Sequence, residues 1–148
     1  MKNNFSLKYS VKFYEEFDEI ISYIKDELKN VIAANNLMDT VEREINNRFH
    51  NPLGYKKYYT NAGNIYYRIY IKNYIVFYTV TDNVMEVRRI TYSKRDLEKL
   101  MNDEEYEEYI ENALDEADRE AEDPSTKYYT HEEMMQIAKR IIDDKEKF

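Results

Sequence analysis

The sequence of 148 residues contains no cysteine and no tryptophan. Without cysteine, the chain has no disulfide bond, no thiolate metal ligand and no cysteine nucleophile. It has only two glycines, Gly54 and Gly63, which excludes a P-loop and a dinucleotide-binding fingerprint, because both motifs need several glycines at fixed spacing. No run of about 18 apolar residues occurs, and the N-terminus lacks the apolar core of a signal peptide. We therefore expect a cytoplasmic chain without a membrane span.

The charge of the chain changes sign near Met101. Residues 1–101 hold 16 Lys and Arg against 13 Asp and Glu, a net charge of +3, and residues 102–148 hold 6 against 17, a net charge of −11. Opposite potentials attract, and a segment on the same chain acts at a high effective concentration. We therefore expect an acidic C-terminal segment that covers a basic surface. A solvated acidic tail is the alternative interpretation.

The periodicity of the apolar residues predicts the elements of the first part. Alternation predicts a strand over residues 5–13, and helical spacing predicts a helical hairpin over residues 17–28 and 34–49. Pro52 ends the second helix, because the residue before a proline disfavours the helical conformation. Alternating apolar residues then predict four strands, at residues 55–60, 65–72, 74–81 and 84–92.

The last three of these strands are joined by short turns, so they form an antiparallel meander. The helical hairpin covers one face of this sheet, and the other face carries Tyr66, Arg68 and Tyr70. Arg88 and Arg89 are neighbours in one strand, so we expect them on opposite faces, with one of them free to pair with a helix carboxylate.

Two further helices are expected in the acidic segment. The first runs over residues 96–122 and ends at Asp123-Pro124-Ser125, and an extended stretch follows at 127–129. Thr130 and Glu133 have the spacing of a capping box, which predicts the start of a last helix that runs to about residue 143. The fold class is therefore α+β, with an N-terminal strand, a helical hairpin, an antiparallel β-meander and an acidic helix–extended–helix tail.

Residues 5–100 resemble the RelE/ParE superfamily of bacterial type II toxins. The order of the elements matches, and so do local stretches at residues 17–24, 33–34, 66–70 and 87–96. The acidic segment resembles the toxin-neutralising region of the partner antitoxins, at residues 116–122 and 129–134. The resemblance implies a RelE/ParE-like toxin domain over residues 1–100, joined to an antitoxin-like neutralising segment over residues 101–148.

The resemblance also implies two alternative activities. RelE-like members are metal-independent endoribonucleases that cut mRNA on the ribosome, and ParE-like members poison DNA gyrase. RNA cleavage needs a fixed cation for the phosphate and a group that moves a proton. Residues that match the family's catalytic positions are Arg68, Arg89 and Tyr92, and the residues expected to bind substrate are Lys56, Lys57, Lys94 and Arg95.

The neutralising segment is expected to dock through its aromatic and apolar side chains, which are Tyr109, Leu114, Tyr128, Tyr129, Met134, Ile137 and Ile141. We expect no cofactor and no metal site. The implied partners are the antitoxin segment and a target that is either ribosome-bound mRNA or gyrase. The segment docks on its own chain or is exchanged between two copies in a homodimer.

A second hypothesis is a catalytically inactive interaction or regulatory module. Ile75 stands where RelE-like members often have an arginine, and no histidine lies near the exit of the last strand of the meander. Both departures remove groups that RNA cleavage could use.

Overall fold

The computed structural model describes residues 5–93 and 101–143. Along the chain, the elements are β1 (Ser6–Ser10), α1 (Val11–Ser22), the π-helical turn η1 (Tyr23–Glu27), α2 (Val31–Phe49), β2 (Tyr58–Tyr59), β3 (Ile65–Ile71), β4 (Tyr74–Thr81), β5 (Val84–Tyr92), α4 (Asp103–Glu122), β6 (Tyr128–Thr130) and α5 (His131–Asp143).

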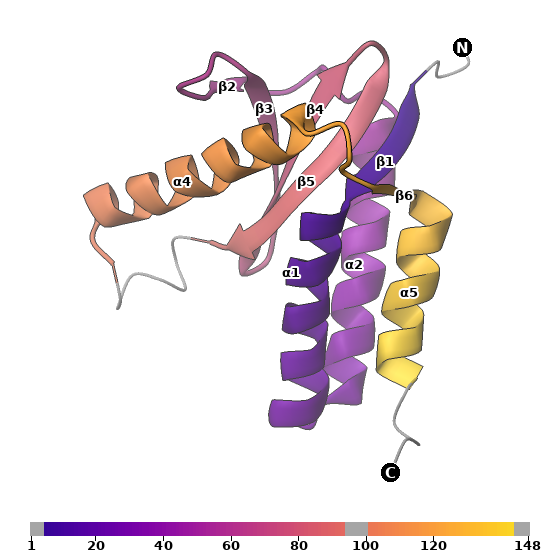
Figure 1. Cartoon of the computed structure of the whole chain (residues 1–148). Helices are drawn as coiled ribbons and strands as arrows, with labels where there is room; N and C mark the ends of the chain where they lie inside the picture. The colour runs from indigo at the N-terminus through magenta and orange to yellow at the C-terminus, as the bar shows by residue number, and fades with distance from the viewer. Residues whose placement is uncertain (1–4, 94–100, 144–148) are drawn as a thin grey trace.

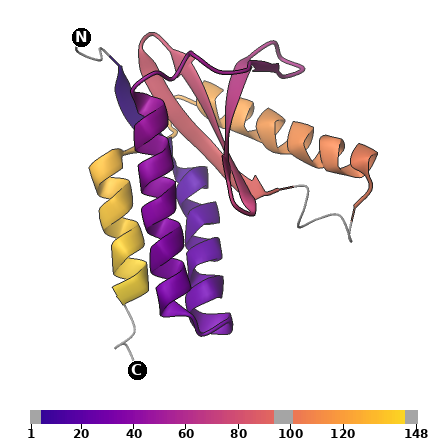
Figure 2. The same cartoon turned by 180° about the vertical axis from the view of Figure 1, so that it is seen from behind.

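A six-stranded sheet, in the order β2-β3-β4-β5-β1-β6, separates two layers of helices. β1 runs parallel to β5, and the other neighbouring strands are antiparallel. Helices α1, α2 and α5 run side by side, whereas α4 lies apart from them and crosses the strands (Figure 1). The same separation is seen from behind (Figure 2). The α+β class, with its strand, helical hairpin, meander and helix–extended–helix tail, is confirmed.

The first strand is shorter than its alternating pattern predicts. β1 ends at Ser10 and α1 begins at Val11, so the prediction of a strand over residues 5–13 is wrong at its C-terminal end. The Ser10 side chain accepts a hydrogen bond from the Phe13 amide at 3.1 Å, which is the geometry of an N-cap. Ser10 Oγ also donates to the Arg88 carbonyl at 2.8 Å. This serine therefore ends the strand, starts the helix and joins both to β5.

A β-bulge interrupts the pairing of β4 with β5. Phe77 is opposite Arg89 and Tyr78 is opposite Val87, so Arg88 is the extra residue on β5. The parallel pairing of β1 with β5 ends at Val87, directly before the bulge. The bulge therefore changes the direction of the side chains that follow it on β5.

The hairpin that joins β4 to β5 is made by Asp82 and Asn83, which have φ values of 50° and 63°. Two successive positive φ values are typical of a type I′ turn, whose twist matches that of the flanking strands. The predicted bounds of β4 and β5 agree with the structure at both ends. This turn sets the pairing of β4 with β5 from the hairpin to the bulge.

Two separate apolar clusters hold the described residues together. The larger, here called the main core, lies between the sheet and helices α1, α2 and α5, and it includes Met134, Ala138 and Ile142 of α5. The smaller, here called the α4 cluster, lies on the other face of the sheet and consists of Tyr66, Ile75, Phe77, Tyr106, Ile110, Leu114 and Ala117. The two helices of the tail are thus buried against opposite sides of the molecule.

The acidic helix begins later than its periodicity predicts. α4 starts at Asp103, and the Asn102 side chain accepts a hydrogen bond from the Glu105 amide at 2.8 Å, so a start at residue 96 is wrong for the described residues 101–102. Residues 94–100 lie outside the described part of the chain. The capping box is confirmed, because Thr130 Oγ1 accepts from the Glu133 amide and the Glu133 carboxylate accepts from the Thr130 amide, both at 3.1 Å.

The burial of α5 leads to a stability prediction. Ile142 is 1% exposed in the main core, whereas Ile32 on α2 is 74% exposed. We expect Ile142→Ala to lower the free energy of unfolding by about 2–5 kcal/mol, because it leaves a cavity. The matched control Ile32→Ala should change it by less than about 0.5 kcal/mol. Urea unfolding monitored by circular dichroism measures both, and equal effects would show that α5 does not belong to the core.

Candidate functional site

The sheet face beneath α4 carries a row of three side chains. Arg68 of β3 is opposite Phe77 of β4, and Phe77 is opposite Arg89 of β5. Directly opposite residues share one face of a sheet. Phe77 is fully buried in the α4 cluster, so the row faces α4. The structure thus brings together the two arginines that the sequence singles out.

Arg88 and Arg89 both reach α4, so the expectation that they point to opposite faces is wrong. Arg88 Nη1 contacts Asp118 at 3.3 Å, and Arg89 Nη1 contacts Glu116 at 3.3 Å. The physical reason is the bulge, which places two residues of β5 opposite one of β4 and breaks the regular alternation of side chains.

Arg89 is buried between α1 and α4, with 6% of its surface exposed. Its Nε and Nη2 atoms donate to the two carboxylate oxygens of Glu16, at 2.8 and 2.7 Å, and its Nη1 donates to the Ala113 carbonyl at 2.7 Å. Glu16 also accepts from the Ile90 amide at 3.2 Å. Burial lowers the pKa of Arg89, but Glu16 and then Glu116 outweigh burial and raise it overall. Arg89 therefore stays charged and is held mainly by α1.

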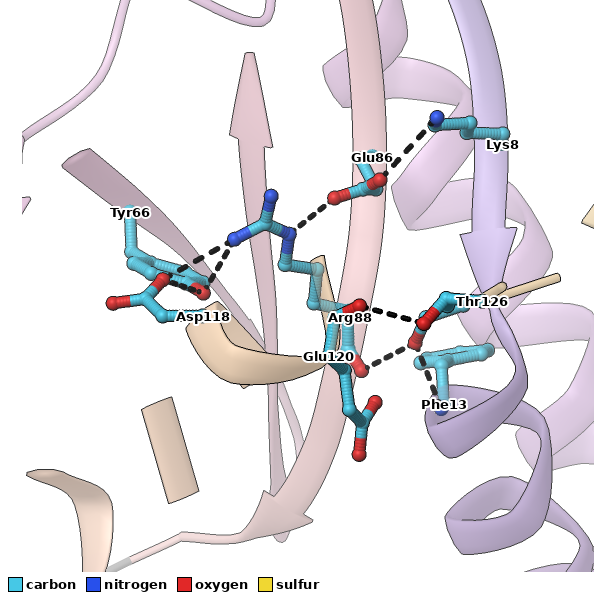
Figure 3. A network of polar contacts seen from close by, with 9 residues as sticks. Lys8, Phe13, Tyr66, Glu86, Arg88, Asp118, Glu120 and Thr126 are labelled. Atoms are coloured by element: carbon cyan, nitrogen blue, oxygen red, sulfur yellow. Dashed lines mark hydrogen bonds and ion pairs between the residues drawn. The ribbon is translucent and has the colours of Figure 1, made fainter. Parts of the chain in front are cut away.

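Arg88 lies between two acidic side chains from different parts of the chain (Figure 3). Its Nε donates to Glu86, which also forms an ion pair with Lys8 at 3.5 Å. Its Nη1 donates to the Tyr66 hydroxyl at 2.7 Å and contacts Asp118. Burial lowers the pKa of Arg88, and the charges and hydrogen bonds of Tyr66 and Glu86 raise it overall.

Asp118 is the most enclosed carboxylate of α4, with 4% of its surface exposed. It accepts hydrogen bonds from the Tyr66 hydroxyl at 2.7 Å and from Thr60 Oγ1 at 3.0 Å, in addition to its contact with Arg88. Burial raises the pKa of the Tyr66 hydroxyl, so this group keeps its proton and acts as a donor to Asp118.

Arg68 is held by aromatic rings rather than by carboxylates. Its guanidinium carbon lies 3.9 Å from the centre of the Tyr58 ring and 5.5 Å from that of Phe77. Such cation–π contacts favour arginine over lysine. Among the described residues, the Arg68 Nε and the Tyr106 hydroxyl are buried without a hydrogen-bond partner. Arg68 is thus attached to the α4 cluster without an ion pair to α4.

Tyr92 does not join this row. It comes three residues after Arg89 in β5, so alternation places it on the other face of the sheet. There it is opposite Tyr74, and the two ring centres are 5.4 Å apart. Tyr92 therefore lies outside the row of Arg68 and Arg89, although it lines a pocket together with Glu16 of α1 and Tyr109 of α4.

The residues expected to bind substrate lie outside the row as well. Lys56 and Lys57 are exposed in the segment before β2, and Lys56 Nζ is 4.9 Å from the centre of the Tyr58 ring. Lys94 and Arg95 lie outside the described residues.

The tail residues expected to dock are divided among three elements. On α4, Leu114 is buried in the α4 cluster and Tyr109 packs beside it. On β6, the Tyr128 ring lies 3.8 Å from Lys8 Nζ of β1. The Tyr129 ring contacts the Tyr14 ring of α1, with centres 5.7 Å apart.

The third element is α5. Met134 is fully buried in the main core, Ile141 packs against that core, and Ile137 is half-buried. The tail therefore contacts the first part of the chain through both helices and through a strand.

Sequence reasoning missed five polar residues that hold the site together, which are Glu16, Thr60, Glu86, Glu116 and Asp118. Asp118 alone carries a signal in the sequence, because it lies four residues after Leu114 and continues the apolar line of α4 with a carboxylate. The contacts of Glu16, Thr60 and Glu116 depend on which strands and helices become neighbours, and that of Glu86 with Arg88 depends on the bulge in β5.

Comparison with protein families bears on the first part of the chain. The family model of the ParE toxin of type II toxin–antitoxin systems, parDE, matches residues 7–97, which is more than half of the 148 residues. The chain belongs to the ParE toxin family. No curated protein and no solved structure matches the chain.

The ParE match divides the site between two parts of the chain. Residues 7–97, here called the toxin part, contain β1–β5 with Arg68, Arg88 and Arg89. The carboxylates of α4, Glu116 and Asp118, lie outside the match. A toxin of this family implies an antitoxin partner.

Two further observations concern ligands and membranes. Along residues 5–93 and 101–143, histidine and carboxylate side chains do not gather in groups of three or more that could hold a metal ion. In those same ranges, none of the helices combines the length and the apolar character needed to cross a bilayer.

A titratable contact joins the tail to the toxin part on the other face of the sheet. His131, the first residue of α5, lines a cleft of about 570 Å³ beside α2. Its Nδ1 lies 2.6 Å from the Tyr9 hydroxyl and its Nε2 lies 3.9 Å from Glu42. Burial lowers the pKa of His131, and the Glu42 carboxylate opposes this effect. The folded chain therefore binds a proton at His131 less readily than the unfolded chain.

This lowered pKa predicts a pH dependence of stability. A histidine whose pKa is lowered by folding stabilises the folded chain at pH values above the ordinary pKa of histidine. This stabilisation is lost as the pH falls through the pKa of the folded state. We expect the fall in unfolding free energy between about pH 7.5 and 5.5 to be smaller in His131→Asn than in the original chain. The second histidine of the chain, His50, is exposed and provides the matched control His50→Asn. Urea unfolding at both pH values measures these free energies. In the control, the fall in unfolding free energy between the two pH values should equal that of the original chain.

Proposed function

We propose that this ParE-family chain is a type II toxin whose active surface is covered by its own C-terminal segment. In this proposal, residues 1–100 form the toxin domain, and residues 101–148 act as the neutralising segment in the manner of an antitoxin. The observation that carries the proposal is the position of α4 on the sheet. The helix buries apolar side chains of the sheet face, and its carboxylates pair with two neighbouring arginines.

The contacts of α4 have the character of an inhibitory interface. An apolar line on the helix meets Tyr66, Ile75 and Phe77 of the sheet. At the edge of this line, Asp118 and Glu116 contact Arg88 and Arg89. Such a combination of an apolar centre with paired charges supports a specific interface rather than a solvated tail.

The two ends of the segment differ in how firmly they are attached. α5 contributes to the main core, whereas α4 is buried in its own cluster on the opposite face. The proposal therefore assigns α4 as the mask and β6 with α5 as its permanent anchor. Removal of α4 from the sheet would leave the main core intact.

The contacts of Arg88 and Arg89, unlike those of Arg68, support gyrase rather than mRNA as the target. Arg89 is bound through two nitrogens by Glu16, and Arg88 is bound by Glu86, and both carboxylates lie in the toxin part. The departure of α4 would not free these cations for a phosphate. Tyr92 lies on the opposite face from Arg89, which also weighs against a joint catalytic role. A toxin that binds a protein target needs neither group for chemistry.

Ile75 has a structural explanation that fits this proposal. It is 2% exposed in the α4 cluster, where an arginine would be buried against the apolar side chains of α4. A charge in that position would cost free energy unless it were paired. The isoleucine therefore suits a surface that docks an apolar helix face.

The proposal predicts that detaching α4 makes the full chain toxic. In Ile110→Lys with Leu114→Lys, two buried residues of the helix become charged, which should release α4 while α5 stays in place. Induction in bacteria should then stop growth and lower DNA supercoiling. A truncation after Met101 is a poorer test, because it also removes Met134, Ala138 and Ile142 from the main core.

The matched control is Glu108→Gln with Glu111→Gln, which changes the net charge of α4 by the same two units at exposed positions. This control should remain harmless. Cleaved mRNA on ribosomes, with normal supercoiling, would replace gyrase inhibition with RNA cleavage. A detached variant that is folded but harmless would reject masking and favour an inactive interaction module.

A further inference from the structure

A pocket of about 310 Å³ lies where α1, β5 and α4 meet. Three tyrosines from three elements line it, since Tyr23 begins η1, Tyr92 ends β5 and Tyr109 belongs to α4. Burial and then the Glu16 carboxylate raise the pKa of Tyr109, and Tyr92 adds to this rise, so these three side chains lie close together. Tyr23 and Tyr92 are 50% and 39% exposed, so the pocket is open to solvent.

Two carboxylates of α1 line the same pocket. Glu16 and Glu19 are three residues apart, which places them on one side of the helix. Glu16 is paired with Arg89, which also contacts Glu116 of α4. Within the described residues, the exposed carboxylate of Glu19 has neither an ion pair nor a hydrogen bond. The three glutamates and the one arginine leave a net charge of −2 around the pocket.

The inner wall of the pocket is apolar. Ile20 of α1 and Ile90 of β5 line it, and both are buried in the main core. Aromatic rings and carboxylates both attract a cation, whereas isoleucine side chains pack against methylene groups. The volume is at the lower end of the range of about 300–1,000 Å³ that is typical of ligand pockets. The lining therefore favours a small organic cation with an alkyl part.

A metal ion fits this lining less well. The described part of the chain brings two carboxylates to the pocket, whereas Mg²⁺ and Ca²⁺ take about six to eight oxygen ligands. The raised pKa of Tyr109 keeps the proton on its hydroxyl, so this side chain adds no anionic oxygen. The two isoleucines would also replace part of the water that a small divalent ion retains.

We propose that this pocket binds a short alkyl diamine or polyamine, with ammonium groups at Glu16 and Glu19 and the alkyl chain against Ile20 and the tyrosine rings. Two ammonium groups match the net charge of −2, whereas a lysine or arginine side chain of a protein brings one positive charge. Carboxylate oxygens accept hydrogen bonds from the N–H groups of an amine, which a quaternary ammonium group lacks.

The position of Tyr109 links this ligand to the tail. Because Tyr109 belongs to α4, the pocket is complete while α4 lies on the sheet. A ligand that binds this arrangement stabilises it by mass action. The pocket does not require the chain to be a toxin, so this inference goes beyond the proposed function.

The first test is a titration of the full chain with putrescine, followed through the isoleucine methyl resonances in NMR spectra at about 0.15 M salt. The resonances of Ile20 and Ile90 should shift and saturate. Ile65 of β3, two strands away from β5, serves as the control and should not shift. Equal shifts at all three positions, or none at Ile20 and Ile90, would overturn the proposal.

Two further probes separate the diamine from simpler cations. Mg²⁺ has the charge of putrescine without its alkyl chain and should give no saturating shift. Butylamine has the alkyl chain with one ammonium group and should bind at least about threefold more weakly. Binding of Mg²⁺ or butylamine with the affinity of putrescine would overturn the assignment to a diamine.

Two variants test the carboxylate and the ring, each with a matched control. We expect Glu19→Gln and Tyr23→Leu to weaken putrescine binding at least about threefold each, because one loses an ion pair and the other a cation–π contact. The controls are Glu15→Gln and Tyr59→Leu, at exposed positions outside the pocket. They should leave the affinity within about 1.5-fold. Equal effects in variants and controls would contradict the assigned site.

Hydrogen exchange tests the contribution of α4. The amides of α4 are compared without putrescine and with putrescine at about ten times its dissociation constant. A ligand that binds only while α4 is in place slows the opening of this helix, so exchange should become at least about threefold slower. Mg²⁺ at the same concentration should leave it unchanged. Unchanged exchange with bound putrescine would show that Tyr109 is not part of the site and would overturn the proposal.

Discussion

The extra residue at Arg88 in β5 is the constraint on which the polar half of the structure depends. Because two residues of β5 oppose one of β4, both arginines are brought towards α4, where a regular strand would direct one of them to the main core. The pairing of β1 with β5 stops at Val87, directly before the bulge, and the chain enters α1 after Ser10, which brings Glu16 to Arg89. The ion pairs of both arginines with α4 thus depend on one irregularity in the sheet.

The two helices of the tail are buried in two places. α5 shares the main core with the helical hairpin, so its apolar side chains stabilise the same unit as those of α1 and α2. α4 meets the sheet from the opposite side, through a smaller apolar cluster with charged contacts at one edge. Separate burial allows one helix to be released while the other remains, which a single continuous interface would not allow. The proposed function, in which α4 leaves the sheet while α5 stays in place, depends on this division.

The sequence predicted the regular elements well and the polar site only in part. Helical spacing and short turns identify the hairpin, the meander and the tail, because these signals are local. Arg68 and Arg89 were identified together, and the structure does bring them into one row. The family resemblance groups Tyr92 with them, although regular alternation over the three residues after Arg89 places Tyr92 on the other face. Glu16, Thr60 and Asp118 were missed, since they meet their partners across 30 or more residues of chain.

By itself, the sequence determined the α+β class, the membership of the toxin family that residues 7–97 carry, and the contrast between a basic first part and an acidic tail. Periodicity and composition are properties of neighbouring residues, so they can be read without coordinates. Only the tertiary structure decided where the tail lies, which carboxylate meets which arginine, and that the two tail helices are buried on opposite sides. The physical reason is that ion pairs and buried hydrogen bonds form between residues that the fold alone makes neighbours, and a bulge of one residue is enough to change which residues those are.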